Sequence, residues 1–191
     1  VRRQRQMCIR DSDDTIWAFS QNARDTFEEV YQKYSYERYF DSFDHFYAIY
    51  QKRNTELWVE YGEGKITKDE LNRQRFFYPL MSVGVEDEAL AEQFSKDFFS
   101  IIPTKRGLMP YAKEVLEYLA PKYNLYILSN GFRELQSRKM RSAGVDEYFK
   151  KVILSEDLGV LKPWPAIFNF ALSATPVSYT HLRAHETLMN L

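Results

Sequence analysis

The sequence predicts an α/β protein, in which a parallel sheet is interrupted by an inserted block of helices. Between residues 20 and about 100, apolar side chains recur only at helical spacing. From residue 110 onward, short apolar runs of strand length alternate with amphipathic segments. Such an alternation implies parallel strands joined by right-handed crossovers. The 191 residues are enough for one such core and a small insertion.

The insertion, residues 20–102, is predicted to be helical throughout. Its apolar residues, many of them aromatic, recur at intervals of three and four positions. Thr67 followed by Glu70 forms a capping box, and we expect the helix that it starts to end near Pro79. A further amphipathic helix precedes Pro103. We expect this block to act as a helical cap over the carboxyl edge of the sheet.

The sheet itself is predicted from the segment between residues 103 and 175, which has a Rossmann-like pattern. A short apolar run at 125–128 is of strand length, and a helix is expected from about 133 to 142. The next strand is predicted at 152–154 and the next helix at 165–173. In open parallel sheets, ligands bind beyond the carboxyl ends of the strands.

Composition and charge exclude several classes of protein. The formal net charge of −1 gives no reason to expect nucleic acid or an anionic membrane as a partner. One cysteine, Cys8, cannot form an internal disulfide and suits a reducing cytosol. No run approaches the roughly 18 apolar residues of a membrane span. The basic start is followed only by Met7-Cys8-Ile9, too short for a secretion signal. We therefore expect a cytoplasmic protein.

Two carboxylates two residues apart, Asp11 and Asp13, form the most informative motif. In an extended segment this spacing points both side chains to the same side, where they could divide nucleophilic and acid–base work at one phosphorus atom. The simpler alternative is a solvated turn or a helix N-cap, both of which favour aspartate. Two polar segments that follow predicted strands, 129–131 and 162–163, favour the catalytic interpretation.

This order of carboxylate pair, hydroxyl at a strand end and lysine resembles the haloacid dehalogenase superfamily of phosphatases. The resemblance covers roughly residues 13–175, and the sequence of segment 155–163 is close to the one that this family usually has there. The presence of Asp13 speaks against the haloalkanoate dehalogenases, whose chemistry protonates no leaving alkoxide. The Asp-Asp-Thr segment and the later Asn-Gly-Phe resemble the bacterial pyrimidine 5′-nucleotidase branch.

The resemblance implies roles for individual residues. Asp11 would form an aspartyl-phosphate and Asp13 would serve as acid and base, while Ser129 would hold a phosphoryl oxygen and Lys162 would offset negative charge. Mg²⁺ would be the cofactor, held by the carboxylate of Asp11 and the backbone carbonyl of Asp13. Substrate-binding positions would be Thr15, Asn130, Gly131 and Trp17. Thr15 could instead brace the loop, and Trp17 could be a core residue.

The two ends of the chain do not fit this pattern. Residues 1 to about 12, and about 176 to 191, resemble translated sequencing-adapter sequence, and we expect both segments to be foreign. Four arginines among the first ten residues oppose a buried strand. The native core would then consist of residues 13–19 and 103–175, with its first and last strands missing or replaced. Asp11 itself could belong to the foreign segment.

The family's fourth motif, an acidic pair that binds magnesium, has no counterpart here. Beyond Asp157 the sequence contains no aspartate, and Glu186 lies in the suspect tail. We therefore expect this chain to be a weak or inactive catalyst.

The function implied by the resemblance is magnesium-dependent hydrolysis of a small phosphomonoester, with a nucleoside monophosphate as the expected substrate. Two alternatives stay open. One is another small-molecule phosphatase on the same scaffold, such as a phosphoglycolate phosphatase. The other is a non-catalytic fragment that binds phosphate or a protein partner without turnover.

Overall fold

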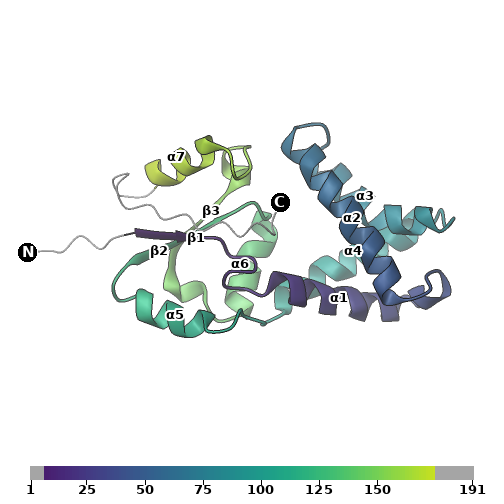
Figure 1. Ribbon diagram of the computed structural model, residues 1–191, viewed down its shortest axis with the longest axis horizontal. Helices are drawn as coiled ribbons and strands as arrows, with labels where there is room; N and C mark the ends of the chain where they lie inside the picture. Colours follow the sequence, from purple (N-terminus) through teal and green to yellow (C-terminus); the bar gives the residue numbers. More distant parts are fainter. Residues whose placement is uncertain (1–6, 175–191) are drawn as a thin grey trace, which may run out of the picture. The chain divides into compact units, whose positions relative to one another are not determined.

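The computed structural model describes residues 7–174, and in this range the chain divides into two compact units (Figure 1). The first unit contains residues 7–20 and 103–174, and the second is Gln21–Ile102. The domain boundaries predicted from the sequence and the role of the second unit as a cap stay predictions. No helix in the described range is long and apolar enough to cross a membrane.

The first unit is built on a three-stranded parallel sheet. Its strands are β1 (Met7–Arg10), β2 (Asn124–Ser129) and β3 (Phe149–Leu154), in the order β1-β2-β3. The central strand β2 is buried from its second residue onward, as its continuous apolar run requires. The predicted parallel α/β core is confirmed, and all three strands end at the same edge of the sheet.

The first strand corrects one expectation. Its basic composition led us to expect a missing or replaced strand. The strand is not missing, because Met7–Arg10 pairs with β2 in the register Met7↔Asn124 to Arg10↔Ile127, while its replacement by foreign sequence stays a prediction. Strand pairing uses main-chain N–H and C=O groups, so composition alone was a poor guide. The foreign origin of residues 1–12 stays a prediction. The expected last strand and residues 176–191 lie outside the described residues.

Three helices flank the sheet: α5 (Ala112–Leu119), α6 (Arg133–Ser142) and α7 (Pro165–Ser173). In Figure 1, α7 lies on one side of the sheet and α5 and α6 lie on the other. Ile167 and Ala171 of α7 pack in one buried cluster with side chains of β2 and β3, namely Tyr126, Leu128 and Ile153. Short 3-10 helices occupy Ile102–Thr104, Asp146–Tyr148 and Ser155–Asp157.

The second unit contains four long helices and a 3-10 turn. The helices are α1 (Phe19–Lys33, which begins in the first unit), α2 (Phe43–Gly62), α3 (Lys68–Ser82) and α4 (Glu88–Ile101), and the turn is Tyr36–Arg38. The capping box at the start of α3 is present as predicted. The expected end near Pro79 is wrong, because α3 continues to Ser82 with Pro79 buried inside it. One missing N–H near the end of a helix is offset there by packing.

Aromatic rings fill the interior of the second unit. Phe27 lies at its centre, with ring centroids 4.2 Å from Tyr50 and 4.3 Å from Phe98. The rings of Phe46, Phe76 and Phe94 lie about Phe27 as well, at 6.0 to 6.1 Å. This unit therefore has a hydrophobic core of its own.

Candidate active site

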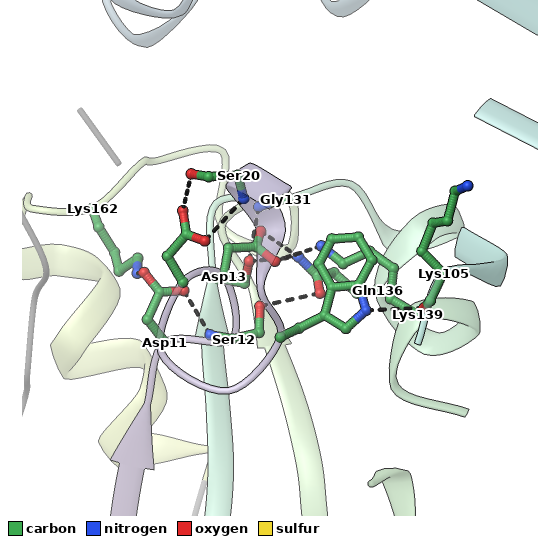
Figure 2. A network of polar contacts seen from close by, with 12 residues as sticks. Asp11, Ser12, Asp13, Ser20, Lys105, Gly131, Gln136, Lys139 and Lys162 are labelled. Atoms are coloured by element: carbon green, nitrogen blue, oxygen red, sulfur yellow. Dashed lines mark hydrogen bonds and ion pairs between the residues drawn. The ribbon is translucent and has the colours of Figure 1, made fainter. Parts of the chain in front are cut away.

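The carboxyl edge of the sheet brings together residues from three distant parts of the chain (Figure 2). Asp11 directly follows β1, Ser129 ends β2, and Lys162 lies in the loop between β3 and α7. The Nζ of Lys162 donates a hydrogen bond to Oδ2 of Asp11 at 2.6 Å, and both side chains are buried. Residues 151 positions apart therefore form one buried ion pair.

The loop after β1 turns tightly and is anchored by Asp14. Its residue Asp14 has a φ of 51°, a left-handed conformation that aspartate tolerates better than most residues. The backbone N–H groups of Ile16 and Trp17 both donate to the carbonyl of Ser12, which closes the turn. The carboxylate of Asp14 accepts hydrogen bonds from the N–H and the hydroxyl of Ser20 at 2.9 and 2.6 Å. These contacts hold the loop in one conformation and so fix the orientation of Asp11 and Asp13, which precede the turn.

A second buried lysine, Lys139 of α6, pairs with Asp13. Its Nζ lies 2.6 Å from Oδ1 of Asp13, and the two side chains are 4% and 17% exposed. Sequence reasoning missed this residue, because a lysine on a helix is a surface residue by default. Each of the two carboxylates thus has its own lysine, which offsets the cost of burying negative charge.

Gln136, also on α6, lies among the same groups and was likewise missed. Its Nε2 donates to Oγ of Ser129 at 2.8 Å, and its Oε1 accepts from Oγ of Ser12 at 3.2 Å. Gln136 precedes Lys139 by three positions, a spacing that places both on one face of a helix. That spacing, directly after a strand that ends in a candidate hydroxyl, was the available signal.

Asn130 connects two of the three segments. Its Oδ1 accepts from the backbone N–H of Lys162 at 2.8 Å, and its Nδ2 donates to the carbonyl of Lys162 at 3.3 Å. Both polar ends of the amide are therefore used to hold the lysine loop. The geometry favours a positioning role for Asn130 over the predicted contact with substrate.

The two remaining predicted substrate-binding residues of this loop, Thr15 and Trp17, are both turned inward. The Oγ1 of Thr15 is buried and has no hydrogen-bond partner among the described residues, so it does not brace the loop through a hydrogen bond. Trp17 has no exposed surface, its ring N–H donates to the carbonyl of Lys105 at 3.1 Å, and the Nζ of Lys139 lies 4.5 Å from its ring centroid. A ring covered in this way offers no face to a nucleobase, which favours a packing role.

Oxygen donors of the kind that Mg²⁺ prefers are present at Asp11 and Asp13. Three further acids near this edge have partners of their own. Asp14 accepts from Ser20, Glu156 accepts from the backbone N–H of Arg133 at 2.8 Å, and Asp157 pairs with the Arg133 guanidinium. Between residues 7 and 174, no group of three or more acidic, histidine or cysteine side chains could hold a metal. Proteins usually bind Mg²⁺ through one or two carboxylates, with water and substrate phosphate as the other ligands. The oxygen ligands that Asp11 and Asp13 offer are therefore of the type that Mg²⁺ requires.

The fold and the site geometry together define an α/β protein whose candidate active site lies at the carboxyl edge of a parallel sheet. The chain belongs to the haloacid dehalogenase-like hydrolases, because the model of that family matches residues 6–189. The predicted family, which is a family of hydrolases, is thereby confirmed.

Similar proteins include one hydrolase and one nucleotidase. The chain is 34% identical to the HAD-hydrolase YfnB of Bacillus subtilis (strain 168) over 130 residues, which make up 68% of this chain and 54% of YfnB. It is 31% identical to the pyrimidine 5′-nucleotidase YjjG of Escherichia coli (strain K12) over 163 residues, 85% of this chain and 68% of YjjG. The chain thus spans about half the length of YfnB.

Solved structures agree with this fold. The crystal structure of magnesium-bound YfnB superposes with a TM-score of 0.83 at 25% identity, covering 95% of this chain and 79% of that one. L-2-haloacid dehalogenase from Xanthobacter autotrophicus gives a TM-score of 0.70 at 18% identity, with coverage of 95% and 69%, a likeness that concerns the fold alone.

Proposed function

We propose that this protein hydrolyses small phosphomonoesters through an aspartyl-phosphate on Asp11, and that nucleoside monophosphates are its substrate class. The observation that carries the proposal is the second carboxylate, Asp13, held by Lys139 beside the Asp11–Lys162 pair. An acid in this place is needed to protonate a leaving alkoxide, whereas the release of a halide needs none. The similarity to a pyrimidine 5′-nucleotidase supports the choice of substrate.

The first half of the reaction transfers the phosphoryl group to Asp11. Lys162 at Oδ2 and the backbone N–H of Ser12, which donates to Oδ1 at 2.7 Å, hold the carboxylate in a fixed orientation. A carboxylate oxygen attacks phosphorus while the bond from phosphorus to the substrate oxygen breaks. In the substrate complex Asp13 carries a proton and gives it to that oxygen, so that a neutral alcohol leaves.

The second half regenerates the enzyme. Asp13, now a carboxylate, takes a proton from a water molecule whose oxygen attacks the phosphorus of the aspartyl-phosphate. The acyl phosphate bond breaks, and Asp11 and inorganic phosphate are released. Ser129 and Lys162 stabilise the negative charge on the non-bridging oxygens.

The proposed cofactor is Mg²⁺, with the Asp11 carboxylate and the Asp13 backbone carbonyl as its protein ligands. When bound, the ion supplies positive charge that neutralises the phosphoryl group and orients it for in-line attack. The single cysteine and the near-neutral charge support a cytoplasmic location for this reaction.

A substrate screen with matched variants tests the proposal. The purified chain is incubated with Mg²⁺ and with pyrimidine and purine nucleoside monophosphates, phosphoglycolate, sugar phosphates and p-nitrophenyl phosphate, and phosphate release is measured. We expect only slow release from the nucleotides, because the family's fourth motif has no counterpart here. Asp13→Asn should lose a further factor of about 10² to 10⁴, and Asp11→Asn should show no turnover. Asp146→Asn, an exposed aspartate of the same unit, is the control.

Three outcomes of this screen would contradict the proposal in different ways. Preference for phosphoglycolate or a sugar phosphate would keep the chemistry and replace the substrate. Unchanged turnover in Asp13→Asn would remove the acid–base role. Phosphate binding without any release would indicate a non-catalytic domain.

A further inference from the structure

We propose that Gln136 is a positioning residue that fixes the Ser129 hydroxyl as a hydrogen-bond donor toward the phosphoryl group and couples it to the loop of Asp13. This inference rests on the proposed function, because it assumes that phosphate binds at Ser129. It assigns a role to a buried amide on α6 that lies outside the segments which suggested the family.

The hydrogen bonds at Ser129 determine where its proton can go. Its Oγ accepts from the backbone N–H of Gly131 at 3.0 Å and from Nε2 of Gln136 at 2.8 Å. A hydroxyl has two acceptor lone pairs and one proton, so both acceptor positions are filled. Among residues 7–174, no group accepts the remaining proton from Ser129. The hydroxyl is therefore set up to donate to an acceptor that is not part of this chain, such as a phosphoryl oxygen.

The neighbours of Gln136 fix which end of its amide faces Ser129. On one side, Oε1 accepts from the buried hydroxyl of Ser12 at 3.2 Å. On the other side, Nε2 lies 3.5 Å from Oδ2 of Asp13. A flipped amide would point its carbonyl oxygen at that carboxylate, an unfavourable contact. Figure 2 shows the Gln136 side chain beside Ser12 and Asp13.

The missing side chain of Gly131 is a second, independent requirement for the contact between Gln136 and Ser129. A Cβ atom on this residue would lie 2.2 Å from Nε2 of Gln136 and 3.2 Å from Oγ of Ser129. Only glycine lets the amide lie this close to the strand end. An alanine here would displace the amide although Gln136 itself is unchanged.

The decisive experiment measures binding of inorganic phosphate in the presence of Mg²⁺, by isothermal titration calorimetry, so that turnover is not required. Gln136→Met keeps the length of the side chain and removes the amide, and Ser129→Ala removes the hydroxyl. We expect each variant to weaken phosphate binding by about 10- to 100-fold, the effect of a hydrogen bond to a charged group. The double variant should bind no more weakly than Ser129→Ala, because Gln136 acts only through the hydroxyl.

Two further variants separate positioning from a contribution to folding. Gln136→Glu keeps the shape but presents an acceptor to Ser129, so it should draw the serine proton away and weaken phosphate binding at least as much as Gln136→Met. Gly131→Ala should weaken binding to a similar degree. Ser137→Ala, an exposed neighbour on α6, should leave binding unchanged. Thermal unfolding of each variant without phosphate shows that it is folded.

The outcomes distinguish this inference from the proposed function. Additive losses in the double variant, or a lower melting temperature with unchanged phosphate affinity, would overturn the role of Gln136 while phosphate binding by the unmodified chain stands. If the unmodified chain binds no phosphate, the proposed function fails first and this inference fails with it.

Discussion

At the scale of single residues, the two buried lysines show how differently the same side chain can be recognised from a sequence. Lys162 was predicted because it lies in a recognisable segment after a strand. Lys139 was not, because a lysine on a helix is expected to be exposed, as Lys113 is, and its spacing of three from Gln136 is a weak signal. Burial, which decides its role, is a property of the packed unit.

Removing the charge of Lys139 should destabilise the protein. In Lys139→Met the carboxylate of Asp13 loses its close cation in a mostly buried place, and breaking such a pair costs about 3–5 kcal/mol of unfolding free energy. Urea unfolding measures the loss. Adding Asp13→Asn to Lys139→Met should recover part of it, because no unpaired charge then stays behind. Lys113→Met is the exposed control, and equal effects of the two single lysine variants would contradict the prediction.

Changing Asn130 should act through Lys162. Asn130→Leu removes both hydrogen bonds to the lysine backbone, and misplacement of a catalytic group by about 1 Å can cost about 10²-fold in rate. We expect kcat for the best substrate of the screen to fall by about that factor. The combination with Lys162→Met should be little worse than Lys162→Met alone. Independent, multiplying losses would instead indicate that Asn130 contacts the substrate.

At the scale of elements, the boundaries that were predicted well are those with local chemical causes. Helix α6 ends as expected, with Gly144 at a φ of 67° shortly after it, and α7 begins at a proline in its first turn. Pro79 was a misleading signal, since a proline near the end of α3 does not end it. A local helix-ending signal fails where burial of the residue offsets the free-energy cost of keeping it in the helix.

The capping box of α3 gives a pH-dependent prediction. Hydrogen bonds from the backbone N–H and the hydroxyl of Thr67 lower the pKa of Glu70 below its ordinary value of 4.5. A lowered pKa means that this stabilisation is present above the ordinary value and is lost as the pH falls through the folded-state pKa. Thr67→Ala should cost about 1 kcal/mol at pH 7, measured by urea unfolding. Glu70→Gln should flatten the loss of stability below pH 4.5, and an unaltered acid limb would contradict this.

At the scale of the whole molecule, two units with separate cores suggest that each unit has its own unfolding transition. The aromatic cluster about Phe27 lies within the second unit, and the candidate active site lies within the first. A substitution in one core and a ligand at the site should therefore act on different parts of a calorimetric unfolding curve.

Scanning calorimetry of Phe27→Ala tests this separation. Deleting a buried phenylalanine side chain costs about 3–5 kcal/mol, and the loss should lower the transition of the second unit. Phosphate with Mg²⁺ should raise the transition of the first unit, by the linkage between binding and folding, and a chelator should reverse the part due to the metal. A single transition that moves with both changes would show that the units unfold together.

The sequence by itself determined the family, the parallel core and the helical second segment, because these depend on periodicity and on order along the chain. On the same basis it predicted Asp11, Asp13, Ser129 and Lys162 as site residues. Folding decided what no local pattern contains: the burial of Lys139 and Gln136, the inward orientation of Trp17 and the use of Asn130 as a bridge. These properties depend on contacts between segments 32 to 126 positions apart, in addition to the local bond from Gln136 to Ser129. The long-range contacts exist only after the strands have aligned their carboxyl ends at one edge.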